Sequence, residues 1–136
     1  MNPNELTAQQ AADWCAVDDG WKHEPMGVHE QYVSPDATLP TFAVLTRTPC
    51  GPYRWVKNGV VRMECPYPLT LDGADAAVPT GWKWARYPLR IIAAWTWVGV
   101  HEATGRHIDV PDTGDKIGDL FRLAVACRVA AKEQTT

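Results

Sequence analysis

The chain has 136 residues, of which 46% are apolar and 21% are charged, and its formal net charge is −3. This length is typical of one compact domain, and the composition is too apolar for a disordered protein and too acidic for a binder of duplex DNA. No run approaches the roughly 18 consecutive apolar residues of a membrane span, and residues 1–10 lack the basic and apolar segments of a secretory signal. We therefore expect a single cytoplasmic domain over residues 1–136 that does not contact a membrane.

The first predicted element is a helix from about Pro3 to Val17. Asn2 can cap its start, and Pro3 suits the first helical position because a residue there needs no backbone N–H donor. The apolar side chains fall on one side of a helical wheel, which predicts that this side docks on the core. These residues are Leu6, Ala11, Trp14 and Cys15. The run Asp18-Asp19-Gly20 ends the helix.

The next segment, residues 21–40, is polar and interrupted by prolines, so only Val28–Val33 is predicted there, as a short edge strand. Thr41–Thr48 is rich in β-favouring residues and is predicted as another strand. Residues 49–52 read Pro-Cys-Gly-Pro, and we expect them to break the chain before the following element.

A hairpin is predicted from Tyr53 to Glu64, because Asn58-Gly59 suits a two-residue turn in which both residues have positive φ. This turn places Trp55 opposite Arg62 on one face of the hairpin. We expect the other face, which is apolar, to lie in the core. It carries Val56, Val61 and Met63.

The second half of the chain is predicted to complete the sheet. Two prolines at positions 66 and 68 exclude a central strand there, and a short helix is predicted over Asp72–Ala77. Leu89–His101 is the longest apolar run and is predicted as the central strand. A three-residue loop, Ala103–Gly105, then leads to a return strand over Arg106–Val110.

In this register His101 lies opposite His107 and beside Asp109 on one face of the sheet, with Trp95 and Trp97 along the same row. Two imidazoles next to a carboxylate can bind a metal ion such as zinc, or act as base and partner in catalysis. The competing interpretation is a polar row that faces solvent. This row is the candidate site for an enzyme or a metal-dependent ligand binder.

The last predicted element is a helix that follows Pro111 and runs to about Lys132, with Asp112 or Thr113 as its N-cap. We expect one arc of this helix to cover the sheet and the opposite side to face solvent. The covering arc carries Ile117, Leu120, Phe121, Ala124, Cys127 and Ala131, and the solvent side carries Asp115, Asp119, Arg122 and Glu133. The predicted fold class is α+β, with an antiparallel sheet of about five strands flanked by N- and C-terminal helices.

Aromatic and basic residues alternate in two stretches, one around Trp55 and Arg62 and one around Trp82 and Trp84. Such stretches are typical of surfaces that bind single-stranded nucleic acid, where bases stack on aromatic rings and cations follow the phosphates. Trp, Tyr and Arg are also enriched at protein–protein hot spots, and a cross-strand Trp–Arg pair stabilises a hairpin without any ligand. Of the two ligand classes, a protein partner is favoured.

Charge is distributed unevenly, since residues 1–36 hold seven acids and one base, whereas residues 37–107 hold eight bases and four acids. We expect the acidic N-terminal part to pack on the basic middle. The four cysteines form no Cys-x-x-Cys pair, which excludes a zinc knuckle and a dithiol redox motif. Cys50 and Cys65 bracket the predicted hairpin, and a cytoplasmic protein is expected to keep them as thiols.

These features predict a small cytoplasmic, non-enzymatic binding protein of the adaptor or inhibitor type, such as those of mobile elements, that needs no cofactor. The predicted partner is another protein. Single-stranded nucleic acid, a second copy of the chain, and the enzyme or metal-dependent binder at the histidine row are the alternatives. The predicted contact surface comprises Trp55, Arg62, Trp82, Trp84, Trp95, Trp97, His101, His107 and Asp109.

Overall fold

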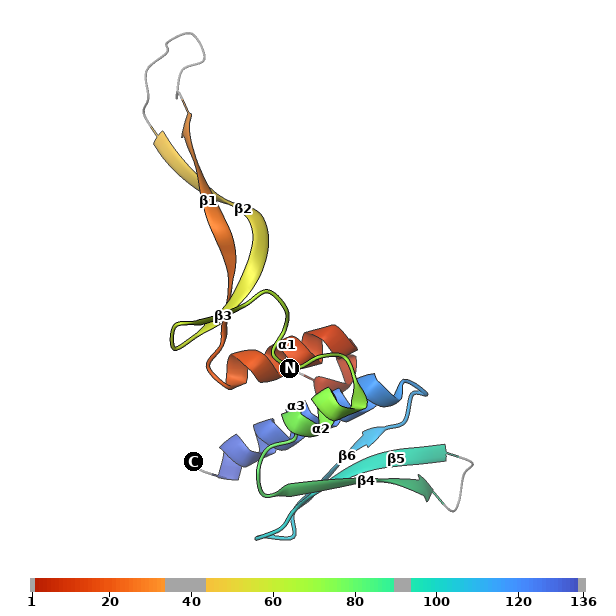
Figure 1. Cartoon of the computed structure of the whole chain (residues 1–136). Helices are drawn as coiled ribbons and strands as arrows, with labels where there is room; N and C mark the ends of the chain where they lie inside the picture. The colour runs from red at the N-terminus through yellow and green to blue at the C-terminus, as the bar shows by residue number, and fades with distance from the viewer. Residues whose placement is uncertain (1, 34–43, 90–93, 135–136) are drawn as a thin grey trace. The chain divides into compact units, whose positions relative to one another are not determined.

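The computed structural model describes residues 2–33, 44–89 and 94–134, with side chains described outside residues 25–52 and 134 (Figure 1). The chain divides into two compact units. The helical unit comprises residues 1–20 and 65–136, and the ribbon unit comprises residues 21–64. The single domain over residues 1–136 stays a prediction, and each unit is described by itself.

The helical unit starts with a short 3-10 helix, η1 (Pro3–Glu5), followed by α1 (Ala8–Asp18). The helix predicted from Pro3 to Val17 is therefore divided. A capping box explains the division, because the Gln10 backbone N donates to Thr7 Oγ1 (3.1 Å) and the Thr7 backbone N donates to Gln10 Oε1 (2.9 Å). Two otherwise unpaired donors are satisfied at this threonine, which makes it the start of the longer helix.

The C-terminal helix, α3 (Lys116–Gln134), confirms the last predicted element but has a different cap. Asp115 Oδ1 accepts from the backbone N of Gly118 at 3.0 Å. The residues predicted as caps have other partners: Asp112 binds Arg86 of the sheet, and Thr113 binds a buried carboxylate of α3.

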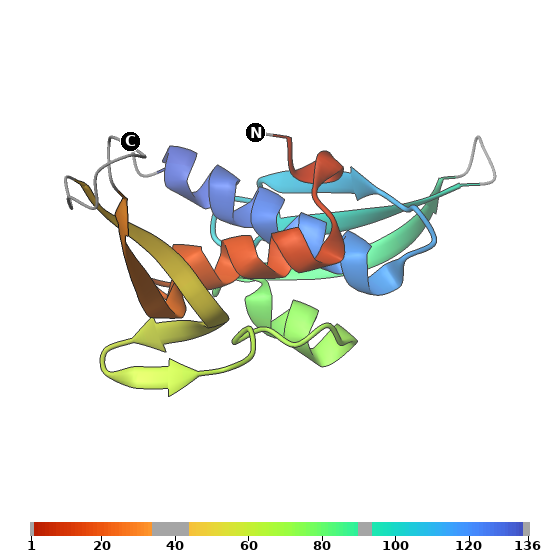
Figure 2. The same ribbon diagram turned by 90° about the horizontal axis from the view of Figure 1, so that it is seen from above.

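The sheet of the helical unit has three antiparallel strands in the order β4 (Trp82–Leu89), β5 (Ala94–His101) and β6 (His107–Pro111). The apolar run predicted as the central strand does contain the central strand, β5. Figures 1 and 2 show α1, α2 (Leu71–Ala77) and α3 on one side of this sheet. The described helices leave its opposite face uncovered.

The core of the helical unit lies where α3 meets the sheet and the other helices. Gly99 of β5 allows α3 to approach this strand closely, because a Cβ atom there would lie 2.5 Å from Cys127 Sγ and 3.5 Å from Leu123 Cδ1. The predicted burial of Cys15 and Cys127 is confirmed. The core comprises Ala11, Ala12, Cys15, Ala74, Ala77, Trp82, Trp97, Val110, Leu120, Phe121, Leu123, Ala124, Val125, Cys127 and Ala130.

Two charged residues that were predicted to face solvent, Asp119 and Arg122, are buried instead. Arg122 Nη2 donates to Asp119 Oδ1 (2.6 Å), and Arg122 Nη1 donates to the backbone O of Leu6 (3.0 Å). The Asp119 carboxylate also accepts from the backbone N and the hydroxyl of Thr113. The charges can be buried because each has hydrogen-bond partners, and they fasten the N-terminal segment to the start of α3.

The ribbon unit contains three antiparallel strands in the order β1 (Lys22–Val33), β2 (Val44–Lys57) and β3 (Val60–Arg62). The predicted turn at Asn58-Gly59 is confirmed, with φ of 50° and 80°. The predicted register is confirmed as well, because Trp55 lies opposite Arg62.

The two longer strands of the ribbon unit depart from the sequence prediction. β1 begins six residues before the predicted Val28–Val33 strand, and β2 continues through the Pro-Cys-Gly-Pro segment that was expected to break it. An irregularity in the register between Pro25 and Gly27 accommodates this segment in the ladder. The first three residues of the predicted strand Thr41–Thr48 lie outside the described residues.

The prediction of one sheet of about five strands was wrong, although the α+β class and the flanking helices are confirmed. The described residues form two three-stranded antiparallel sheets. Two prolines and α2 separate β3 from β4 along the chain, and the strands of residues 21–64 pair only with one another in the described residues. The chain therefore completes the first sheet before it starts the second.

Candidate binding surfaces

The predicted row of His101, His107 and Asp109 does not form, because the register between β5 and β6 was wrong by one residue. The connecting loop has four residues rather than three, closed by the His101 backbone N, which donates to the O of Arg106 (2.8 Å). His107 consequently lies opposite Val100, and Asp109 lies on the same face two residues later. Alternate residues of a strand face opposite sides of its sheet, so His101 lies on the other face.

The imidazole of His101 has a structural role in this loop. Its Nδ1 accepts from the backbone N of Thr104 (3.2 Å) and lies 2.9 Å from the Thr104 hydroxyl. Its ring also packs edge-on against Trp82, with ring centroids 5.1 Å apart. A side chain held in this way stabilises the turn and closes the end of the core, and it shares no ligand with His107.

The tryptophans predicted as a contact surface mostly pack inside the helical unit. Trp82 and Trp97 are buried, and Trp84 is half-buried with its ring tilted against Trp97. Trp84 Nε1 donates to Asp75 at the end of α2 (2.6 Å). These indoles fill the space between the sheet and the helices, and the hydrogen bond of Trp84 satisfies its N–H group, as is usual for buried tryptophans.

Trp95 is exposed and covers an ion pair at the edge of the sheet. Arg86 binds both carboxylate oxygens of Asp112, at 3.2 and 3.0 Å, and its guanidinium lies 4.4 Å from the centre of the Trp95 ring. Trp97 Nε1 donates to the same carboxylate (3.0 Å). These hydrogen bonds, first from Arg86 and then from Trp97, hold the pKa of Asp112 below its usual value.

In the ribbon unit, Trp55 is buried although the sequence places it in the predicted contact surface. Its ring stacks on His23 at 4.3 Å with an interplanar angle of 5°. Next to it, Arg54 binds Glu24 across the same two strands, with Nε and Nη2 at 3.1 and 3.0 Å from Oε1. Trp55 and its neighbours thus hold β1 and β2 together.

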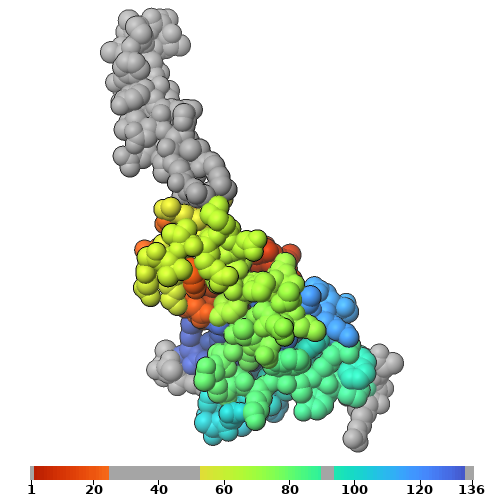
Figure 3. All heavy atoms as spheres, in the orientation of Figure 1, coloured from red at the N-terminus to blue at the C-terminus, as the bar shows by residue number. Residues whose placement is uncertain are grey.

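The opposite face of this hairpin was predicted to be core, but Val61 and Met63 on that side have 52% and 56% of their surface accessible, and only Val56 is half-buried. Val60 and Tyr53, which share the face of Trp55, have 54% and 50% of their surface accessible. The space-filling view shows residues 53–63, coloured yellow to yellow-green, at the surface (Figure 3). Such a concentration of large apolar side chains in eleven residues is uncommon for surfaces that stay in water.

Two basic residues lie among these apolar side chains. Lys57 and Arg62 make no ion pair with the described part of the chain. Lys57 flanks the turn, and Arg62 is the last residue of β3. We name the exposed surface of the hairpin the hairpin patch; it comprises Tyr53, Lys57, Val60, Val61, Arg62 and Met63.

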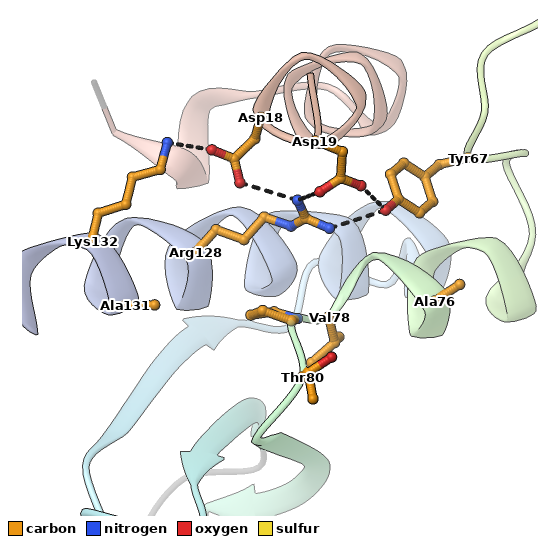
Figure 4. A pocket seen from close by; sticks show the side chains of 10 residues that line it. Asp18, Asp19, Tyr67, Ala76, Val78, Thr80, Arg128, Ala131 and Lys132 are labelled. Carbon is orange, nitrogen blue, oxygen red and sulfur yellow. Dashed lines mark hydrogen bonds and ion pairs between the residues drawn. The ribbon is translucent and has the colours of Figure 1, made fainter. Parts of the chain in front are cut away.

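A pocket with a volume of about 480 Å³ lies in the helical unit beside a network of charged groups (Figure 4). Arg128 Nη1 donates to Asp18 (3.1 Å) and Asp19 (2.6 Å), and Nη2 donates to the Tyr67 hydroxyl (3.1 Å). Tyr67 donates in turn to Asp19, and Lys132 pairs with Asp18. The remaining wall is formed by Ala76, Val78, Pro79, Thr80 and Ala131.

The Arg128 network is saturated by its own members. Arg128 also donates to the backbone O of Ala77 (2.8 Å) and Cys15 (3.3 Å), and no buried side-chain polar atom of the described residues lacks a partner. Burial and the hydrogen bond to Asp19 raise the pKa of Tyr67 to about 12. The network therefore fastens the end of α1 and the segment around Tyr67 to α3.

This network also corrects the expected charge pairing. The acids at the end of α1 pair with Arg128 and Lys132 of the C-terminal helix rather than with the basic middle of the chain. The expected pairing does occur in the ribbon unit, between Glu24 and Arg54.

Within the described part of the chain, no three His, Cys, Asp or Glu side chains gather in a way that could hold a metal ion. None of the helices in residues 2–33, 44–89 and 94–134 combines the length and the apolar character that a membrane crossing needs. Comparisons with protein-family models, with curated proteins and with solved structures found no match.

Proposed function

We propose that this chain is a non-enzymatic binding protein of the adaptor or inhibitor type, and that its hairpin patch contacts a partner protein. The observation that carries the proposal is the exposure of four large apolar side chains next to two bases that make no ion pair with the described residues. Interfaces combine an apolar centre with Tyr and Arg side chains, and the patch has this composition.

The rigidity of the hairpin supports the same function. The patch is held in place by the tight turn at Asn58-Gly59 and by Trp55, which is buried and stacked on His23. A preformed surface loses little conformational freedom when it binds, so more of its contact energy appears as affinity.

An enzyme has less support. The residues predicted for catalysis lie on opposite faces of the sheet, and His101 is engaged by its own turn. Binding of single-stranded nucleic acid also has less support, because Trp55 and Trp82, two of the rings expected to stack on bases, are buried. We place the activity in the cytoplasm, where the buried thiols of Cys15 and Cys127 are stable.

The proposal is tested by co-purification from the natural host with two matched double variants. Val60→Asp/Met63→Asp places two carboxylates in the hairpin patch, whereas Leu69→Asp/Leu71→Asp makes the same change at two exposed leucines of the helical unit. We expect the first variant to lose the bound partner and the second to retain it. Retention of the same partner by both variants would overturn the proposal.

A further inference from the structure

The two outer strands of the ribbon unit differ in how they expose their edges. β1 carries Pro25 and a register irregularity at Gly27, and both features obstruct the addition of another strand. β3 pairs with β2 on one side and, in the described residues, with no strand on the other. It contains neither a proline nor an irregularity.

The register identifies the backbone groups that the edge of β3 offers. In a two-residue hairpin the residues that close the turn, here Lys57 and Val60, exchange both of their hydrogen bonds. The next pair, Val56 and Val61, is then a non-hydrogen-bonded pair. The N–H and C=O groups of Val61 therefore point away from β2, toward the free edge.

The side chains around this edge indicate what it accepts. Val60 and Val61 are exposed on opposite faces of the hairpin, so an added strand would find an apolar neighbour on each face. Lys57 and Arg62, the charged residues within the stretch 57–62, make no ion pair with the part of the chain that the structure describes, and both are positive. Glu64 lies beyond the paired part of β3.

We propose that an extended, acidic segment of the partner protein adds to the free edge of β3 as a further strand. The inference rests on the proposed function, because it names the way in which the same patch is bound. Backbone hydrogen bonds to Val61 set the register of the added strand, and its carboxylates pair with Lys57 and Arg62. The edge is short, so we expect affinity in the micromolar range.

Charge and the burial of Trp55 favour an acidic peptide over two other candidate occupants of this edge, a second copy of the chain and single-stranded nucleic acid. A second copy of the chain would bring another Lys57 and another Arg62 to the same ladder, and like charges across strands are destabilising. Single-stranded nucleic acid would supply the negative charge, but Trp55, the largest ring of the hairpin, is buried and cannot stack on a base. An acidic peptide satisfies both the charge and the backbone groups.

The inference is tested by selecting peptides from a displayed random library on the full-length chain. We expect the selected peptides to be acidic and to alternate apolar with polar residues, as an added strand would. Selection of basic peptides, of peptides without alternation, or of none would overturn the inference. An oligothymidylate titration is run in parallel, and tighter binding of this oligonucleotide than of any selected peptide would also overturn it.

Two variants examine the edge itself. Val61→Pro removes the outward N–H and leaves the hydrogen bonds to β2 intact, so it should weaken peptide binding about tenfold, whereas Val61→Thr keeps the donor and should bind like the natural chain. The fluorescence of the tryptophans shows whether Trp55 stays buried in each variant. If Val61→Pro disturbs the hairpin, the double variant Lys57→Glu/Arg62→Glu replaces it, and it should reverse the preference from acidic to basic peptides.

The outcomes distinguish this inference from the proposed function. If the natural partner requires Val60 and Met63 but binds Val61→Pro and Lys57→Glu/Arg62→Glu as tightly as the natural chain, the patch is an interface and strand addition is wrong. If the Val60→Asp/Met63→Asp variant retains the partner, the proposed function itself fails.

Discussion

Replacement of Arg128 by methionine should destabilise the helical unit strongly. Arg128 is 7% exposed and donates to Asp18, Asp19, Tyr67 and two backbone carbonyls. Loss of one partner from a buried ion pair costs about 3–5 kcal/mol, and the partial exposure of Asp19 argues for the lower end of this range. For a unit of this size, about 3 kcal/mol lowers Tm by roughly 12 °C or more.

The matched control is Lys132→Met on the same helix. Lys132 pairs with Asp18, but its side chain is 61% exposed, so its loss should cost about 1 kcal/mol or less. Thermal and urea denaturation, followed by near-ultraviolet circular dichroism, measure both variants. Equal, small losses for Arg128→Met and Lys132→Met would refute the argument that the Arg128 network fastens α1 to α3.

Three further predictions concern single groups. Burial raises the pKa of Cys15 and of Cys127 to about 12, so iodoacetamide followed by mass spectrometry should label these two thiols only after the chain is unfolded. The pKa of Tyr67 is also raised to about 12, so the stability that this phenol contributes should be present below about pH 10 and lost as the pH rises through 12. Absorbance at alkaline pH should show one late tyrosine ionisation that is absent from Tyr67→Phe. Gly59 has φ of 80° and no atom near its missing Cβ, so Gly59→Val should cost about 1–3 kcal/mol through backbone strain alone, and an unchanged midpoint in urea would contradict this.

Local signals in the sequence were sufficient for much of the fold. Asn58-Gly59 requires positive φ at two positions, and this requirement determines the hairpin and its register. The apolar run that ends at His101 is long and rich in β-favouring residues, and it contains the central strand. The helices at both ends follow from apolar periodicity, although their first residues depend on caps at Thr7 and Asp115.

The candidate site was harder to predict because it depends on contacts between distant segments. One additional residue in the loop after His101 moves His107 to the other face of the sheet, and composition does not determine loop length. A signal for the buried arginine was present, since Arg128 follows Phe121 and Ala124 at helical spacing and therefore lies on the apolar arc. Its partners at the end of α1 are more than a hundred residues away along the chain.

The positions of the tryptophans were also difficult to predict from the sequence. A residue such as Trp55 or Trp82 suits a binding surface and a core equally well by type, and only the packing of the folded chain assigns it to one of them. The aliphatic side chains of the hairpin patch, Val60, Val61 and Met63, have no aromatic ring that would indicate a binding surface in the sequence. They became a candidate surface only through their exposure.

Hydrogen–deuterium exchange on the chain, alone and in complex with the partner that co-purifies with it, tests the central claim most directly. The account predicts that binding slows exchange at the backbone amides of residues 53–63, with the amide of Val61 among the most protected, and leaves the outward face of the sheet β4–β6 unchanged. Slower exchange confined to β4–β6, with residues 53–63 unaffected, would contradict it.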